Sequence, residues 1–258
     1  MAANAAYRHL RFNAVGVLGC AIVAAWTVCA WAELTGNAAQ LHHHALYESG
    51  RPYWFAALVV VAAWQFMTAA MMLPSSLGFI RVYATAAARA PDFPLALILF
   101  LGGYFAVWTA FALAAFTGDM QLHRVVDAWP WLAAHATLIP AGTLGLAAIY
   151  QLTPLKDACL KSCRHPGIYL KSHYRRGALN GLRLGFGHAL YCVGCCWALM
   201  LVMFAAGVAH LAWMGALAVI MFVEKATPLG NRVVAPVGVV LGSLAVIALL
   251  VPGAIGGL

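Results

Sequence analysis

The chain has 258 residues, of which 64% are hydrophobic and 9% are charged, and its formal net charge is +8. Soluble domains carry about a quarter charged residues, so this composition excludes an ordinary soluble protein and indicates an integral membrane protein. The positive charge lies mainly between the apolar segments and at their ends. We therefore expect it to fix the orientation in the membrane rather than to bind nucleic acid.

Apolar segments of about the length needed to cross a bilayer recur along the chain. They predict an all-α, polytopic transmembrane helix bundle that forms a single integral membrane domain over residues 1–258. The first segment is too long for the core of a cleavable signal peptide, and the boundary between the fifth and sixth is uncertain. About seven spans are predicted, at residues 12–34, 53–73, 94–117, 129–149, 180–206, 209–224 and 233–253.

The basic residues predict the orientation of these spans. If the N-terminus is cytoplasmic, only Arg51 and Arg124 lie among the outside segments, and the other Lys and Arg residues lie inside. This bias follows the positive-inside rule and favours an odd number of spans. We expect a multi-pass protein of the bacterial inner membrane, with its C-terminus outside and a cytoplasmic loop at about 150–178.

The fifth segment is rich in side chains that bind soft metals. On a helix that turns about 100° per residue, His188, Cys192, Cys195 and Met203 fall within a sector of roughly 80°, and Cys196 lies at its edge. Thiolates and thioethers favour Cu(I), whereas thiolates also hold zinc or iron–sulfur clusters. We predict a metal site at the three cysteines, with His188 and Met203 as possible further ligands, and copper as the metal ahead of zinc or iron.

Packing is the alternative interpretation of this stripe, because a free cysteine behaves as a small hydrophobic residue. Gly181, Gly185 and Ala189 lie on the same side of the segment. Small residues at this spacing are typical of close contacts between transmembrane helices.

Methionines of the second segment could complete the site. Trp64, Met67 and Met71 share one helical face, and Met72 follows them. Met67 and Met71 are therefore candidate Cu(I) ligands, although methionine is also a common filler of hydrophobic cores.

The predicted cytoplasmic loop contains Cys159, Cys163 and His165. The two cysteines would share a face if this part of the loop is helical, and thiols stay reduced in the cytosol. A second metal group is one interpretation; a surface loop that contacts anionic lipid headgroups is the other.

The predicted outside loops contain further polar side chains. His42–His44 could collect Cu(II) or Zn²⁺ at the surface or could belong to an ordinary polar loop. His123 lies between Asp119 and Asp127, a combination that would suit a harder metal than the cysteines do. His135 is better explained as an interfacial residue than as a ligand.

Glu224 and Lys225 end the sixth segment. Glu224 could pair with a basic residue of the cytoplasmic loop, carry protons, or extend to the interface. We expect Lys225 to extend its ammonium group to the membrane surface.

Several of these residues carry a resemblance to a known family. The chain resembles a bacterial family of predicted metal-binding integral membrane proteins, sometimes labelled copper chaperones, from about residue 60 to 226. The resemblance implies metal binding at Cys192, Cys195 and Cys196, and at Cys159 and Cys163, but no reaction. It rests on Trp64-x₂-Met67-x₃-Met71-Met72-x-Pro74, Tyr150-Gln151-x-Thr153-Pro154-Leu155-Lys156-x₂-Cys159-x₃-Cys163-Arg164-x-Pro166, Gly194-Cys195-Cys196-Trp197-x-Leu199-Met200, Trp213-Met214 and Glu224-Lys225.

Three functions fit these observations. The first is copper handling: the chain would bind Cu(I) and move it across the membrane or deliver it to a periplasmic or membrane metalloprotein. The second is a subunit of a metal-dependent membrane oxidoreductase or oxygenase, and the third is a structural anchor or assembly factor. The sequence lacks Walker-type, GxSxG and HExxH motifs, so we expect no enzymatic activity from the chain on its own.

Overall fold

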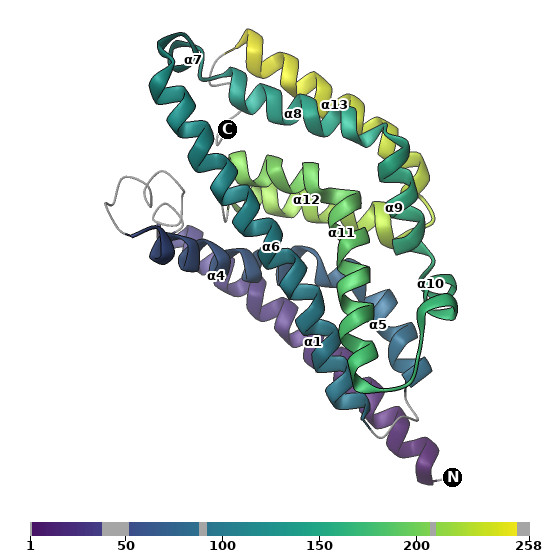
Figure 1. The fold of residues 1–258 in the computed structure, drawn as a ribbon. Helices are drawn as coiled ribbons and strands as arrows, with labels where there is room; N and C mark the ends of the chain where they lie inside the picture. The colour runs from purple at the N-terminus through teal and green to yellow at the C-terminus, as the bar shows by residue number, and fades with distance from the viewer. Residues whose placement is uncertain (1, 38–51, 88–91, 207–209, 252–258) are drawn as a thin grey trace.

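The computed structural model describes residues 2–37, 52–87, 92–206 and 210–251, and the side chains among them except at 2–13 and 204–206. All regular elements within these ranges are α-helices (Figure 1). They are α1 (Ala2–Leu34), α4 (Tyr53–Met71), α5 (Leu73–Ala87), α6 (Phe93–Ala128), α7 (Pro130–Ala134), α8 (Leu138–Gln151), α9 (Pro154–Arg164), α10 (Pro166–His173), α11 (Ala178–Ala206), α12 (Leu211–Ala226) and α13 (Gly230–Leu250).

Five stretches of helix are long and apolar enough to cross a membrane: Ala14–Leu34, Tyr53–Met71, Phe93–Ala128, Ala178–Met203 and Gly230–Leu250. The pair α8–α9, bent by 67° at its break, would be a sixth. Helix α12 has 16 residues and is shorter than these. The all-α class is thus confirmed, and these helices are compatible with a membrane protein, whereas the number of about seven spans and the cytoplasmic N-terminus stay predictions.

The second predicted span ends in a break rather than in a loop. Helix α4 ends at Met71, and Met72 leads directly into α5, which has Pro74 in its first turn. A proline is tolerated there because the first amides of a helix have no carbonyl partner within it. The sequence predicted no helix for this stretch, so α5 is a correction.

The fourth predicted span, 129–149, is wrong as one continuous helix. Trp129 has an extended backbone (φ −123°, ψ 93°), as expected for a residue that precedes a proline. Helix α6 continues past its predicted end and stops at Ala128, just before this residue. The short α7 and then α8 follow. Asp119, His123 and Asp127 consequently lie on the end of α6 and not in a loop.

The predicted cytoplasmic loop is also helical in large part. Thr153 caps α9, since its hydroxyl accepts a hydrogen bond from the Lys156 amide at 3.3 Å, and Pro154 occupies the first position of the helix. This is a common way to begin a helix. Helix α9 packs against α11 and α12, so the loop covers the bundle.

Glycines bring α6 and α11 into close contact. A Cβ atom at Gly181 would overlap the Ala96 carbonyl, and one at Gly185 would overlap the Phe100 carbonyl. The close helix contact that these two glycines predicted is confirmed.

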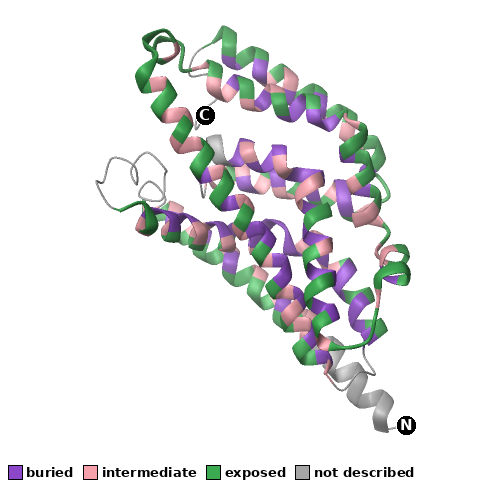
Figure 2. Ribbon diagram, in the orientation of Figure 1, coloured by how far each residue is buried: buried purple, intermediate pink, exposed green. Residues whose placement is uncertain are grey.

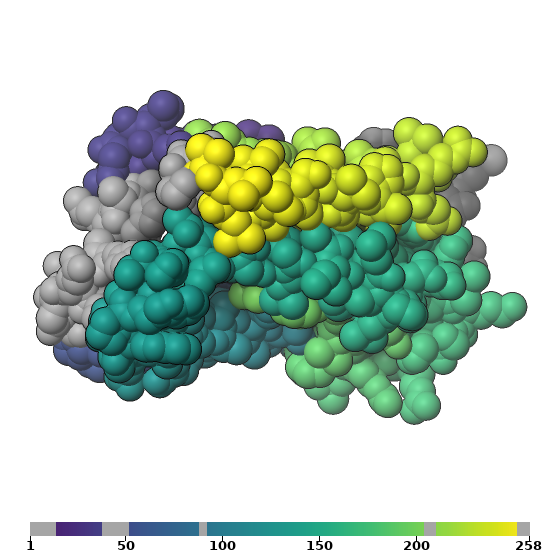
Figure 3. All heavy atoms as spheres, turned by 90° about the horizontal axis from the view of Figure 1, so that it is seen from above, coloured from purple at the N-terminus to yellow at the C-terminus, as the bar shows by residue number. Residues whose placement is uncertain are grey.

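The buried residues line the inner sides of the helices, and the outer sides carry many exposed apolar side chains (Figure 2). Trp31, Leu58, Ile98 and Val239 are among the exposed ones, which suits a surface that faces lipid. Helix α13 lies along α8 on one side of the molecule (Figure 3). The largest core cluster contains all three cysteines of α11.

Candidate metal site

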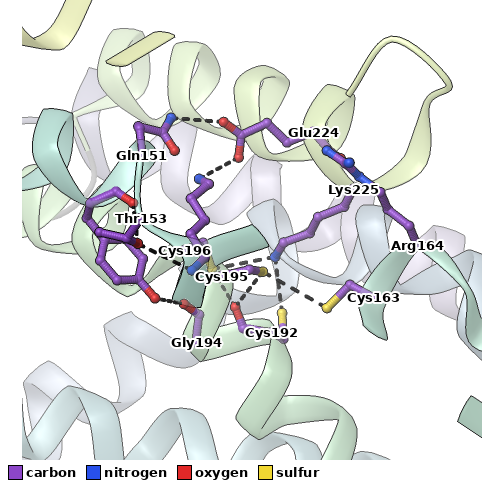
Figure 4. A network of polar contacts seen from close by, with 12 residues as sticks. Gln151, Thr153, Cys163, Arg164, Cys192, Gly194, Cys195, Cys196, Glu224 and Lys225 are labelled. Atoms are coloured by element: carbon purple, nitrogen blue, oxygen red, sulfur yellow. Dashed lines mark hydrogen bonds and ion pairs between the residues drawn. The ribbon is translucent and has the colours of Figure 1, made fainter. Parts of the chain in front are cut away.

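The cysteines of α11 lie deep in the bundle. Cys192, Cys195 and Cys196 are at most 1% exposed, and all seven cysteines of the chain are free thiols. Residues of α9 and of the end of α12 lie around them (Figure 4). Met72, at the break between α4 and α5, also contacts Cys196. Segments far apart in the sequence therefore meet at one turn of α11.

Three sulfur atoms surround the ammonium group of Lys225. Its Nζ lies 3.2 Å from Cys192 Sγ, 3.5 Å from Cys196 Sγ and 3.5 Å from Met72 Sδ. The sulfurs of Cys196 and Met72 are 3.8 Å apart. We call Met72, Cys192 and Cys196 the sulfur triad; it gathers two thiols and one thioether around a cation.

Lys225 therefore contradicts the sequence-based expectation. It was expected to extend to the membrane surface, but its side chain is directed into the core and the residue is only 6% exposed. The reason is the sulfur atoms, which offer hydrogen-bond acceptors to the ammonium group within the bundle. No regular pattern in the sequence indicates this contact.

A second group of sulfurs lies on the α9 side of α11. Cys163 Sγ is 4.0 Å from Cys195 Sγ, and Cys159 packs so closely on Gly194 that a Cβ there would lie 2.6 Å from its sulfur. Cys159 and Cys163 are intermediate in exposure, unlike the cysteines of α11. The loop thiols thus lie between the buried cysteines and the outside of the bundle.

An ion pair fixes α9 above the site. Lys156 Nζ lies 2.8 Å from Glu224 Oε2, with both side chains 1% exposed, and Gln151 Nε2 donates to Glu224 Oε1 at 2.9 Å. Arg164 Nε donates to the Glu224 backbone carbonyl at 2.6 Å. Pairing of Glu224 with a basic residue of the loop, one of the sequence-based alternatives, is therefore confirmed.

Charge is unevenly balanced in this region. Among the residues that the structure describes, Glu224 is the single buried carboxylate and lies beside two buried lysines, of which it pairs with Lys156. Lys225 instead donates to the sulfurs. A buried charge is costly unless it is paired, and an ionised thiol is both the natural partner for this ammonium and the form that binds metals.

His188 lies one step away from the triad. Its Nε2 is 3.2 Å from Ser76 Oγ, whose hydroxyl donates to Tyr104 at 3.3 Å; the Tyr104 hydroxyl lies 3.3 Å from Cys192 Sγ. The imidazole also stacks on Phe79, with a distance of 4.1 Å between ring centroids. His188 thus reaches the cysteines through other side chains, and a ligand role for it stays a prediction.

The remaining predicted residues divide by location. Met67, Met71 and Met203 lie in the same buried core as the cysteines, and Met72 Sδ lies 3.8 Å from Cys196 Sγ. His42–His44 lie outside the described residues. His123 bonds through Nδ1 to the Asp119 carbonyl at 2.9 Å and lies 3.5 Å from its carboxylate.

Among the described residues, His, Asp and Glu side chains do not add further ligands to the sulfur triad. In the described part of the chain, no three side chains of His, Cys, Asp or Glu converge closely enough to hold a metal ion. The group that does converge includes the thioether of Met72. Two thiols with a thioether form a soft, low-coordinate donor set, which suits Cu(I) better than zinc, whose structural sites have four ligands.

The fold and this site define an all-helical membrane protein with a buried cluster of sulfur side chains. The profile of the PpoB2 family, described as copper chaperone, matches residues 61–248. The chain belongs to this family, which confirms the resemblance found in the sequence. No curated protein and no solved structure matches the chain.

The motifs that carried the resemblance meet in space. Tyr150 donates to the Gly194 carbonyl and packs edge-on against Trp197, with the ring centroids 4.9 Å apart. Gln151, Lys156 and Arg164 all bind Glu224, as described above. The loop motif, the Gly-Cys-Cys-Trp motif and the Glu-Lys motif therefore build one structure, the wall around the cysteines (Figure 4).

Proposed function

We propose that the protein is a membrane copper chaperone that binds Cu(I) at Met72, Cys192 and Cys196 and passes it to another copper protein. The convergence of these three sulfurs on one buried point carries the proposal. The description of the family as copper chaperone supports it. Copper is here the cargo, and the sulfur ligands determine which metal is accepted.

The second sulfur group supports exchange rather than storage. Cys195 is adjacent to Cys196 on α11 and faces Cys163 at 4.0 Å. Cu(I) could therefore pass by exchange of thiol ligands from the triad to Cys195, and then to Cys163 and Cys159 on the more exposed side. We propose this as the route by which the buried site exchanges copper with the cytoplasmic face.

Copper binding by the purified full chain tests the proposal. In detergent, under reducing conditions, the wild-type protein should retain Cu(I) against a chromogenic Cu(I) chelator. The variant with Cys192→Ala, Cys195→Ala and Cys196→Ala should lose that copper. Unchanged stoichiometry in this triple variant would overturn the site.

Met72→Leu distinguishes a ligand role of the Met72 thioether from a role in core packing. It should weaken Cu(I) affinity by roughly tenfold, the equivalent of about 1.4 kcal/mol. Met71→Leu is the matched control, because Met71 is equally buried one residue earlier and methionine and leucine have similar volumes. Equal effects of the two substitutions would assign Met72 to packing alone.

A further inference from the structure

Lys225 occupies the position in the sulfur triad that a metal cation would take. Its ammonium group is within 3.5 Å of all three sulfurs, and the residue is almost fully buried. Buried lysines normally pair with carboxylates. Here the neighbouring carboxylate, Glu224, has Lys156 and Gln151 as its partners, so the sulfurs serve as the counter-group of Lys225.

Two cations cannot share this position. A Cu(I) ion bound to the triad would lie close to the ammonium group, and like charges repel strongly where the surroundings are apolar. Copper would also use the sulfur lone pairs that accept the hydrogen bonds from Lys225. Binding of metal to the triad therefore requires the ammonium group to withdraw.

Lys225 lies close to an exposed part of the chain. Lys225 lies in the last turn of α12, and the segment that follows is exposed at Ala226, Pro228 and Leu229. A lysine side chain has a flexible four-carbon stem that can turn its charged end toward a polar boundary. The membrane-surface orientation that the sequence suggested is the second position that this withdrawal requires.

We propose that Lys225 is a built-in competitor of copper: its ammonium group fills the triad in the metal-free protein, and Cu(I) enters by displacing it. This inference rests on the proposed function and adds its regulation. The competing cation keeps the empty site ordered and lowers the affinity for copper, and the returning ammonium group assists release to a partner. A chaperone needs such release, whereas a storage site does not.

Neutralising Lys225 tests the inference. Lys225→Gln keeps the approximate length of the side chain and removes the charge that repels Cu(I). Cu(I) affinity in the chelator competition should therefore rise by at least about tenfold, the equivalent of about 1.4 kcal/mol. Lys171→Gln, on the exposed surface of α10, should leave the affinity unchanged. An affinity equal to or below that of the wild type in Lys225→Gln overturns the inference.

A double variant tests whether Lys225 acts at the sulfur triad. In the presence of Cys192→Ser, which breaks the triad, Lys225→Gln should no longer increase the affinity. An increase that persists there would mean that Lys225 acts elsewhere, and the inference fails. If the wild-type chain binds no Cu(I) at all, the proposed function itself fails; if it binds Cu(I) but Lys225→Gln does not tighten binding, only the competitor role fails.

Amine labelling gives a readout that needs no substitution. In the metal-free wild-type protein Lys225 should resist an acylating reagent, because it is buried and bonded to sulfur. Loading with Cu(I) should increase its labelling, measured by mass spectrometry, while labelling of the exposed Lys161 stays constant. Equal labelling of Lys225 in the two states would overturn the displacement. This test uses the wild-type protein, so it remains valid even if Lys225→Gln fails to fold.

Discussion

At the scale of single residues, a buried ion pair holds the helices beside the cysteines together. Lys156 and Glu224 form an ion pair of 2.8 Å in which both side chains are 1% exposed. Such a pair contributes little relative to an apolar pair of the same size, but loss of one partner leaves a buried charge uncompensated. The pair thus holds α9 to α12 only as long as both residues are present.

Glu224→Gln should lower the free energy of unfolding by about 3–5 kcal/mol, because Lys156 would remain buried without a carboxylate. Thermal unfolding of the purified protein in detergent measures this loss. Asp157→Asn is the control: Asp157 pairs with Lys161 at the same 2.8 Å, but both side chains are more than half exposed, and such surface pairs contribute about 1 kcal/mol or less. Similar effects of the two substitutions would contradict the role given to burial.

At the scale of helices, α11 is positioned by its glycines. Gly181 and Gly185 allow the backbone of α11 to touch the carbonyls of Ala96 and Phe100 on α6. One turn further along the helix this contact brings His188 beneath Tyr104, and then Cys192 within reach of the Tyr104 hydroxyl. The contact between α6 and α11 therefore also positions the cysteine proposed to bind copper.

Gly185→Ala should separate α6 from α11, since the new methyl group would meet the Phe100 backbone and not a flexible side chain. We expect a destabilisation of about 1–3 kcal/mol, the usual range for overpacking, together with weaker copper binding. Gly102→Ala provides the matched control on α6, because a Cβ there meets nothing within 4 Å. Unchanged stability in Gly185→Ala would show that the helices can shift without cost.

At the scale of the whole molecule, the orientation of the chain would decide which face receives copper in the proposed function. Five helices, or six with the bent pair, satisfy the length and hydropathy needed to cross a membrane, and the short α12 would bring the number to seven. Seven crossings would put the two ends of the chain on opposite sides. The basic residues then favour a cytoplasmic N-terminus and place α9, with Cys159 and Cys163, at the cytoplasmic face.

Reporter fusions test this arrangement. A reporter that is active only outside the cytoplasm should work when fused after Leu258 and should fail when fused after Arg164, the end of α9. A reporter that requires the cytoplasm should give the opposite result at both points. Activity of the same reporter at both points would put α9 and the C-terminus on the same side of the membrane. That result would contradict the arrangement.

The sequence by itself determined the class of protein and placed the cysteines of α11 on one helix. Composition and the length of the apolar segments were sufficient for an all-α membrane bundle, because a bilayer leaves few other ways to satisfy the backbone. Helical periodicity also placed the cysteines of α11 on one stripe and predicted the close contact at Gly181 and Gly185. These features concern the faces of a single helix, and the spacing of residues along the sequence is sufficient to predict them.

Only the tertiary structure decided which neighbours face that stripe. The sequence favoured Met67 and Met71, which share a regular helical face, yet the break between α4 and α5 turns Met72 toward Cys196. The direction of Lys225 was likewise missed, because rules for a residue at a helix end assume that water is its best partner. Contacts between helices depend on breaks, crossing angles and buried charges, and these arise only when the whole bundle is assembled.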